Sequence, residues 1–125
     1  MIQLLSKINL TDNSGVLEGK VIKVLTPKNA KIAKLGSLIL ISCKSSIKNS
    51  GILPGTKFKA LVVRLKKTNL NNKISWNQNN VVLVKLAPKN NEFLPISSRI
   101  KGPINSNLLR LNGYQKVVSL AKHVI

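Results

Sequence analysis

Four short runs of β-branched and apolar residues dominate the hydrophobic pattern of the chain. The runs are shorter than typical helices and are rich in Val and Ile, which favours strands. The pattern predicts strands at residues 19–25, 37–44, 56–65 and 79–86. The segments TDNSG, TPKN, LPG, NLNNK and APKNNE supply the Gly, Pro, Asn and Asp residues that reverse the chain direction. We therefore expect an all-β body.

The run FKALVVRLKK at residues 58–67 is apolar at its start and cationic at its end. Strict alternation divides it into two sets, with Phe58, Ala60, Val62 and Arg64 on one face and Lys59, Leu61, Val63 and Leu65 on the other. Both faces are mainly apolar, as expected for a strand covered on both sides or curled into a small barrel. Arg64 is then expected near the barrel rim, with Lys66 and Lys67 in the loop that follows.

The last part of the chain has a different periodicity. Apolar residues recur there at helix-like spacings, at Leu108, Leu111, Tyr114, Val117, Val118 and Ala121. Asn112-Gly113 interrupts the pattern, so we expect two short helices rather than one long helix. The 125 residues fit a single domain with its own core, divided into a β-body at about residues 1–103 and a helical part at about 104–125.

The net charge of the chain limits the classes of partner that it can bind. The chain has 21 Lys and Arg residues against 3 Asp and Glu, a net charge of +18. Self-repulsion of this size destabilises a compact state, and a polyanion relieves it. Disorder does not fit, because 43% of the residues are hydrophobic. No apolar run approaches the roughly 18 residues that span a bilayer, and no basic amphipathic helix is evident. We expect nucleic acid as the partner and no membrane.

The sequence contains no credible active site. Proton transfer and covalent catalysis need positioned acids, bases or nucleophiles, and the few candidates are Asp12, Glu18, Glu92 and His123. Turn or surface roles are expected for all four. Cys43 is the only cysteine and stands among apolar residues, so it is interpreted as a small buried hydrophobe. We expect no catalysis, no metal and no cofactor.

The type of nucleic acid follows from the residues that carry the charge. Aromatic residues make up 3% of the chain, too few for the stacking platforms of single-strand binders. Lysine greatly outnumbers arginine and meets phosphate as a point charge, which favours sequence-independent contact with the backbone. The cations are also dispersed over several loops rather than concentrated on one helix. This pattern predicts a protein embedded among several elements of folded RNA.

Ordered motifs along nearly the whole chain resemble those of the universal large-subunit ribosomal protein fourteen family (ribosomal protein L-fourteen), in its organelle-encoded form. The motifs are MIQ, NLTDNSGVLEGKVIKVL, KALVVRLKK, ISWNQNNVVLV, PISSRIKGPI and KVVSLA. The resemblance implies a mainly β fold: a small closed five-stranded β-barrel with an extended hairpin and short C-terminal helices. It also implies binding to large-subunit rRNA, a place at the subunit interface with contact to small-subunit rRNA, and contact with neighbouring ribosomal proteins. A ribosome-silencing factor is a further implied partner.

The resemblance leads to a set of expected site residues. The rRNA-binding residues are Lys23, Lys28, Lys31, Lys34, Lys44, Lys48, Arg64, Lys66, Lys67 and Lys73. Arg99 and Lys101, in the SRIKGP match, are assigned to the subunit interface. The chain departs from the family pattern at Trp76, where Phe is usual, and at Asn77, where Asp is usual.

Composition also bears on the compartment. Lys, Asn, Ile and Leu are abundant, which is typical of AT-rich organelle genomes, and the MIQ start agrees with synthesis inside an organelle. We expect a mitochondrial ribosome, with a plastid or an AT-rich bacterium as alternatives. The rival function is a free, non-ribosomal RNA-binding or RNA-chaperone β-barrel.

Overall fold

The four predicted strands are present in the structure, a computed structural model. It describes residues 2–26, 30–48, 51–66, 76, 78–86, 93–104 and 115–121. The predicted strands correspond to β3 (Val16–Val24), β5 (Leu38–Ser46), β6 (Lys57–Arg64) and β7 (Asn80–Leu86). The hydrophobic pattern did not reveal four shorter strands, which are β1 (Ile2–Gln3), β2 (Lys7–Leu10), β4 (Ile32–Ala33) and β8 (Phe93–Pro95).

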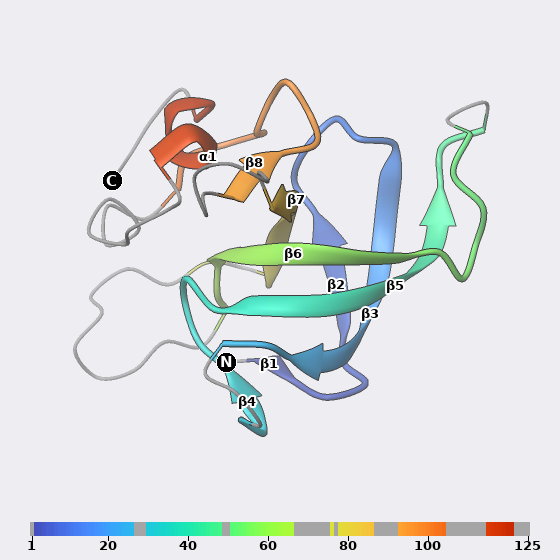
Figure 1. Ribbon diagram of the computed structural model, residues 1–125, viewed down its shortest axis with the longest axis vertical. Coiled ribbons are helices and arrows are strands. Elements are labelled where there is room, and N and C mark those ends of the chain that lie inside the picture. The colour runs from blue at the N-terminus through green and yellow to red at the C-terminus, as the bar shows by residue number, and fades with distance from the viewer. Residues whose placement is uncertain are drawn as a thin grey trace.

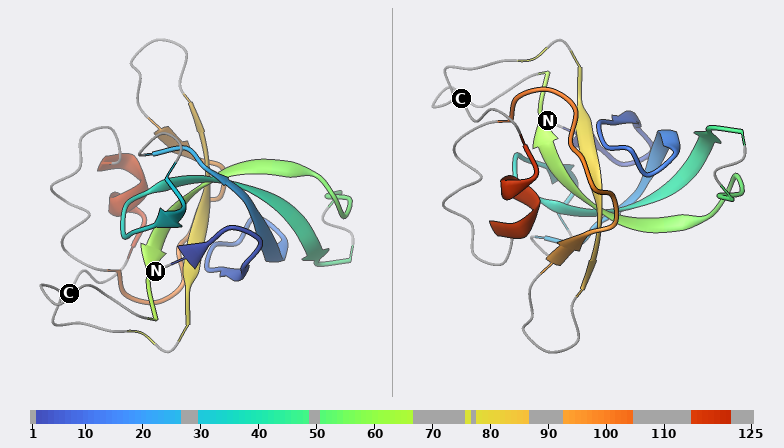
Figure 2. Two further views of the ribbon diagram at one scale, coloured as in Figure 1. Left: turned by 90° about the horizontal axis from the view of Figure 1, so that it is seen from below. Right: turned by 90° about the horizontal axis from the view of Figure 1, so that it is seen from above.

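Five of the strands form a closed barrel (Figures 1 and 2). Antiparallel pairs connect them in the order β2-β3-β5-β6-β7. The barrel closes through a parallel pair between β2 and β7, in which Asn9 lies opposite Asn80 and Leu10 opposite Val81. β8 adds to β7 outside this ring, and β1 pairs with β4 in a separate two-stranded sheet. The prediction of a small closed five-stranded barrel is confirmed.

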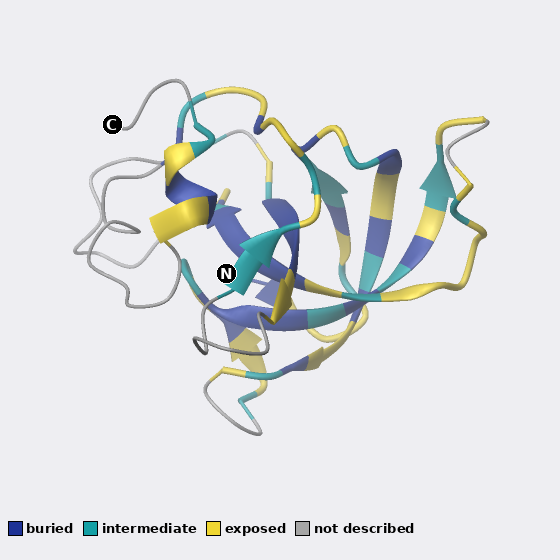
Figure 3. Ribbon diagram, turned by 45° about the horizontal axis from the view of Figure 1, so that its top comes forward, coloured by how far each residue is buried: buried dark blue, intermediate teal, exposed yellow. Residues whose placement is uncertain are grey.

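Two hydrophobic clusters explain why β6 is apolar on both faces. Ala60 and Val62 belong to the cluster inside the barrel, together with side chains of β2, β3, β5 and β7. Leu61 and Val63 belong to an outer cluster that includes Ile104 and residues of the C-terminal helix. Buried residues therefore occupy both faces of the central strands (Figure 3). The expectation of a strand covered on both sides is correct.

Strict alternation fails at the end of β6. The pairing register between β6 and β7 shifts between Val62 and Arg64, which is a β-bulge with Val63 as the extra residue. Leu65 consequently packs in the inner cluster rather than with Leu61 and Val63, which corrects the predicted face. Arg64 lies opposite Asn80 and so shares the outer face of the barrel wall.

The C-terminal part contributes a short helix, α1 (Gln115–Ser119), beside β8 (Figure 2). Val117 and Val118 are buried in the outer cluster, and Ala121 forms a parallel bridge with Ile100. α1 corresponds to the second of the two predicted helices. The first was predicted within residues 105–114, which lie outside the described residues. Among the helices of the described ranges, none is long and apolar enough to cross a bilayer.

Candidate nucleic-acid interface

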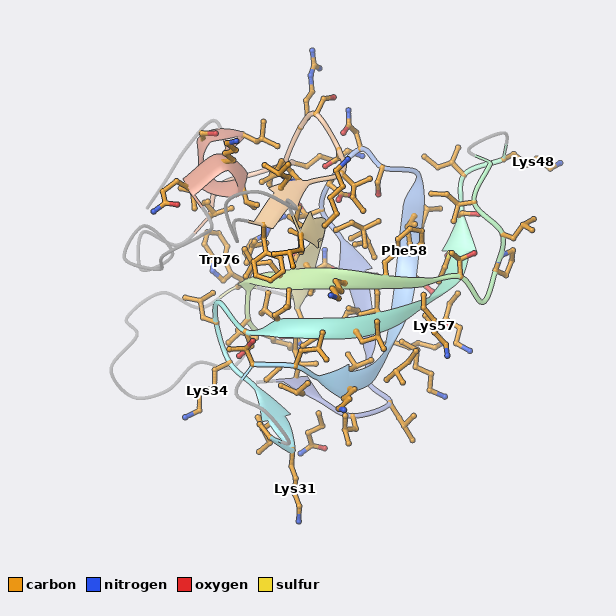
Figure 4. All side chains as sticks on the ribbon, viewed as in Figure 1. Lys31, Lys34, Lys48, Lys57, Phe58 and Trp76 are labelled. Carbon is orange, nitrogen blue, oxygen red and sulfur yellow. The ribbon has the colours of Figure 1, made fainter. Side chains whose placement is uncertain are left out.

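The predicted cations lie on several sides of the barrel. Eight are exposed, namely Lys23, Lys31, Lys34, Lys44, Lys48, Lys66, Arg99 and Lys101. Figure 4 shows Lys48 at the end of the hairpin between β5 and β6, and Lys31 at the far end of the molecule beside β4. The structure thus does not bring the set together in one cleft. Lys28, Lys67 and Lys73 fall outside the described residues, and Arg64 is half-buried.

Sequence reasoning left out some cations that the structure exposes. Lys57 and Lys59 are exposed on β6, where they alternate with the half-buried Phe58. The alternation in the sequence was a usable signal, because a lysine on each side of a core residue in a strand faces away from that core. Lys7 and Lys85 are exposed as well. The cationic surface is therefore wider than the predicted set.

The first cationic surface is the hairpin tip, which we define as residues 47–48 and 51–56. Lys48 is exposed at the tip, with Lys44 and Lys57 at its base. The tip is held by short-range bonds: Thr56 Oγ1 donates to Leu53 O at 2.7 Å, and Gly55 N donates to Cys43 O at 2.8 Å. It also exposes apolar side chains, since Leu53 is 74% exposed and Ile47 is 52% exposed.

The second cationic surface is the 98–102 loop, and it is held by residues distant in the sequence. Asn13 Oδ1 accepts hydrogen bonds from Ser98 N at 3.0 Å and Arg99 N at 3.1 Å. Asn13 Nδ2 donates to Ser98 Oγ at 2.9 Å. One side chain of the TDNSG segment therefore satisfies three polar groups of the loop, which fixes its first half.

Thr11 holds the second half of the loop. Lys101 N donates to Thr11 O at 2.6 Å, and Thr11 Oγ1 donates to Lys101 O at 2.7 Å. Between the two cations, Ile100 is buried in the outer cluster. Arg99 and Lys101 stand on either side of this anchor and are both exposed. The loop presents two positive charges from a backbone that is bonded at both halves.

Asp12 has a structural role at the same place. Its Oδ2 accepts a hydrogen bond from Leu83 N of β7 at 3.0 Å, and its Oδ1 accepts one from Ser14 Oγ at 2.7 Å. Asp12 is 5% exposed, and it also forms an antiparallel bridge with Ile100. The prediction of a turn role for Asp12 is confirmed. Its negative charge is turned inward, away from the cationic surface.

Arg64 contacts the 98–102 loop from the outer face of the barrel wall. One guanidinium nitrogen, Nη2, donates to Lys101 O at 2.8 Å and to Thr11 Oγ1. The guanidinium carbon lies 5.8 Å from the centroid of the Trp76 ring. Burial lowers the pKa of the Arg64 guanidinium below its ordinary value, but arginine stays charged in proteins at neutral pH. Arg64 is therefore an internal cation, unlike the exposed lysines.

A surface hollow of about 520 Å³ adjoins the loop and is lined by Asn13, Arg99, Ile100, Lys101, Gly102 and Leu120. Among the described residues that line it, Arg99 and Lys101 are the cations. In the part of the chain that the structure describes, no three His, Cys, Asp or Glu residues gather in a way that could hold a metal ion. Cys43 is buried as expected, and burial raises the pKa of its thiol. The arrangement is suited to binding anions.

Residues 1–125 match the protein-family model described as ribosomal protein L14p/L23e. The match covers the whole chain and so includes the barrel, the hairpin tip and the 98–102 loop. It agrees with the family that the ordered sequence motifs resemble. The closed barrel and the dispersed exposed lysines fit the same family.

Proposed function

Because the chain belongs to the ribosomal protein L14p/L23e family, we propose that its dispersed exposed cations bind folded rRNA and that its 98–102 loop lies at the subunit interface. Proteins of this family are structural constituents of the large ribosomal subunit, where they bind rRNA and other ribosomal proteins, and they are not enzymes. One observation carries the proposal: a net charge of +18 is displayed by a folded body whose charges are exposed on several sides.

The distribution of the lysines supports contact with several RNA segments at once. A lysine ammonium neutralises a phosphate without reading sequence, and each such contact releases counterions. The proposed rRNA-binding residues are Lys23, Lys28, Lys31, Lys34, Lys44, Lys48, Arg64, Lys66, Lys67 and Lys73. Binding by about ten phosphate contacts would fall as roughly the seventh to ninth power of salt concentration. For Arg64 the contact with phosphate stays a prediction, because the described contacts of its guanidinium are internal.

Arg99 and Lys101 are the proposed contacts to small-subunit rRNA. Joining two preassembled particles favours surfaces that lose little conformational freedom on contact. The 98–102 loop meets this condition, because Asn13 and Thr11 hold its backbone and Ile100 anchors it. A ribosome-silencing factor is proposed to bind the same surface and so to block the joining of subunits.

The proposed compartment is the mitochondrial ribosome. Support comes from the abundance of Lys, Asn, Ile and Leu, which AT-rich organelle genomes encode. Immunodetection of the protein in purified mitochondria, plastids and cytosol tests it. We expect the signal with mitochondrial large subunits, and a signal confined to plastids or a bacterial source would contradict this part of the proposal.

Sedimentation tests the ribosomal role itself. A tagged chain is expressed in its own cells, and lysates are run on density gradients in low and high salt. We expect the protein to stay with large subunits after the high-salt wash, because many contacts inside an assembled particle are not lost together. A free RNA chaperone would move to the top of the gradient. Loss of Arg99 and Lys101 charges should leave the protein in large subunits but weaken their association with small subunits.

A further inference from the structure

Arg64 is distinguished from the other predicted RNA ligands by its surroundings. Its side chain is half-buried, whereas all other described members of the set are exposed. The β-bulge at Val63 is the reason for its position, since strict alternation would have placed Arg64 with Val62 inside the barrel. The extra residue turns the guanidinium to the outer face. There it meets the end of β2 and the 98–102 loop.

The guanidinium joins segments that are far apart in the sequence. Nη2 donates to Thr11 Oγ1, 53 residues away, and to the carbonyl of Lys101, 37 residues away. Hydrogen bonds from a charged donor are about twice as strong as neutral ones. Lys101 N and Lys101 O are thus both bonded to the body of the protein. The backbone between the two exposed cations cannot move without breaking these bonds.

Gly102 shows how closely the loop is fitted around the guanidinium. A Cβ atom added at Gly102 would lie 2.6 Å from Arg64 Nη1, a distance that real Cβ atoms do not show. The guanidinium also lies over the ring of Trp76, and the backbone N–H of Trp76 donates to Leu65 O at 3.2 Å. Arg64 Nε and Trp76 Nε1 are both buried without an acceptor among the described residues. The guanidinium is therefore partly enclosed, with its Nε buried.

We propose that Arg64 is a positioning residue, which holds the 98–102 loop in the conformation that displays Arg99 and Lys101. The consequence of this role for the ribosome rests on the proposed function, whereas the structural role of Arg64 does not. It depends on the reach of the arginine side chain, because Nη2 makes both bonds, to Thr11 and to Lys101. A lysine keeps the charge, but its nitrogen lies one bond closer to the backbone than Nη2, and nothing in lysine replaces Nη1 beside Gly102.

The first experiment measures how readily the loop opens in the purified full-length protein. Hydrogen exchange of the Lys101 amide is compared in the wild type, Arg64→Lys and Arg64→Met. We expect exchange at Lys101 to accelerate about tenfold in both variants, the effect of losing one hydrogen bond in the closed state. Ile39→Val, in the inner cluster, is the control for a general loss of stability. The proposal is overturned if Arg64→Lys exchanges as the wild type does, or if Ile39→Val accelerates Lys101 to the same extent.

The second experiment measures function in large subunits purified with each variant in place. Their association with small subunits is followed by light scattering over a range of Mg²⁺ concentrations. We expect Arg64→Lys to weaken association as much as Arg64→Met does, and both to resemble Arg99→Gln with Lys101→Gln. Wild-type association with Arg64→Lys but not with Arg64→Met would assign the effect to the charge at position 64 and overturn the inference.

The Arg99→Gln and Lys101→Gln double variant separates the two proposals. If it leaves subunit association unchanged, the interface role of the loop is wrong, and the exchange of the Lys101 amide still decides the role of Arg64. If it weakens association while the Arg64 variants do not, the interface role stands and the inference about Arg64 fails.

Discussion

The hairpin tip and the 98–102 loop both present cations, but different contacts hold them. Bonds that shape the tip connect residues close in the sequence or directly across the hairpin, as between Thr56 and Leu53. Bonds that shape the loop reach from Asn13 and Thr11, 85 to 90 residues away. A segment held by local bonds can change its conformation when it binds a partner. A segment bonded to distant residues already has a fixed conformation before it binds. The two surfaces are therefore suited to different partners.

We interpret the tip as the surface that fits itself into RNA during assembly, and the loop as the surface that docks against a preformed particle. Figure 4 places the tip, marked by Lys48, on the opposite side of the barrel from Trp76. The tip also exposes Leu53 and Ile47, while the loop buries Ile100 between its cations. Substitutions in matched pairs, one at each surface, test this difference.

The largest effect is expected from adding a methyl group at Gly102. Gly102 and Gly55 both have positive φ angles, of 75° and 89°, so alanine is strained at either position. A Cβ at Gly102 also meets the Arg64 guanidinium, whereas a Cβ at Gly55 meets nothing within 4 Å. We expect the strain of a positive φ to lower the free energy of unfolding by about 1–2 kcal/mol in either variant. Gly102→Ala must also displace the end of the Arg64 side chain and disturb its two hydrogen bonds, so we expect its loss to be larger by about 1–2 kcal/mol. Thermal unfolding of the two variants measures the difference, and equal losses would contradict the close fit around Arg64.

A smaller effect is expected at Asn13. Asn13→Ala removes the partner of Ser98 N, Arg99 N and Ser98 Oγ, with an expected loss of about 1–3 kcal/mol. Ser46→Ala is the matched change at the hairpin, because it removes only the bond from Ser46 Oγ to Ile52 O, with an expected loss of about 1 kcal/mol or less. Denaturant unfolding gives both values. A loss at Ser46 as large as that at Asn13 would mean that the tip is held as firmly as the loop.

Removal of charges at the two surfaces is expected to weaken binding to different partners. Lys44→Gln with Lys48→Gln should lower the salt dependence of binding to large-subunit rRNA by about 1.4–1.8 in the log–log slope, because two phosphate contacts are lost. Arg99→Gln with Lys101→Gln should leave this slope unchanged, since the loop is proposed to face the small subunit. Filter binding at several KCl concentrations measures the slopes. A lower slope for the Arg99 and Lys101 pair would place the loop against large-subunit rRNA instead.

The smallest effect on stability is expected at Leu53. The side chain is 74% exposed, so Leu53→Ser should change the free energy of unfolding by no more than about 0.5 kcal/mol. If the tip fits into RNA, the same variant should still reduce incorporation into large subunits. Quantification of the variant in gradient-purified subunits checks this, and Leu86→Ser on β7, where the side chain is 48% exposed, is the control. Normal incorporation would show that the apolar tip has no RNA contact.

Much of the fold could be predicted, because it depends on contacts that the sequence pattern encodes directly. The Val- and Ile-rich runs predicted β3, β5, β6 and β7. The apolar character of both faces of β6 predicted that hydrophobic residues cover this strand on both sides. The short strands were missed because two to four residues carry too little periodicity to recognise. The parallel closure between β2 and β7 was not visible either, since it joins residues about 70 positions apart.

The candidate site was predicted in its residue types but not in its construction. Arg99 and Lys101 were selected with the SRIKGP motif, and the structure shows both exposed on a bonded loop. Asn13 was noticed only as part of a turn, because a hydrogen bond to a residue 85 positions away leaves no local pattern. Arg64 was grouped with the exposed cations because it ends an apolar run just before Lys66 and Lys67. The bulge that brings it against the 98–102 loop leaves no pattern in the sequence.

The sequence by itself determined that the protein is a small β-domain with far more positive charge than it can neutralise, and its motifs determined the family. Only the tertiary structure decided which of the described cations face outward, and that Arg64 is half-buried against the 98–102 loop. The physical reason is that composition and periodicity depend on residues that are neighbours in the sequence. The position of a side chain, inside or outside the barrel, depends on the pairing register of its strand. A single bulge at Val63 exchanged the faces of Arg64 and Leu65 and brought the guanidinium beneath the 98–102 loop.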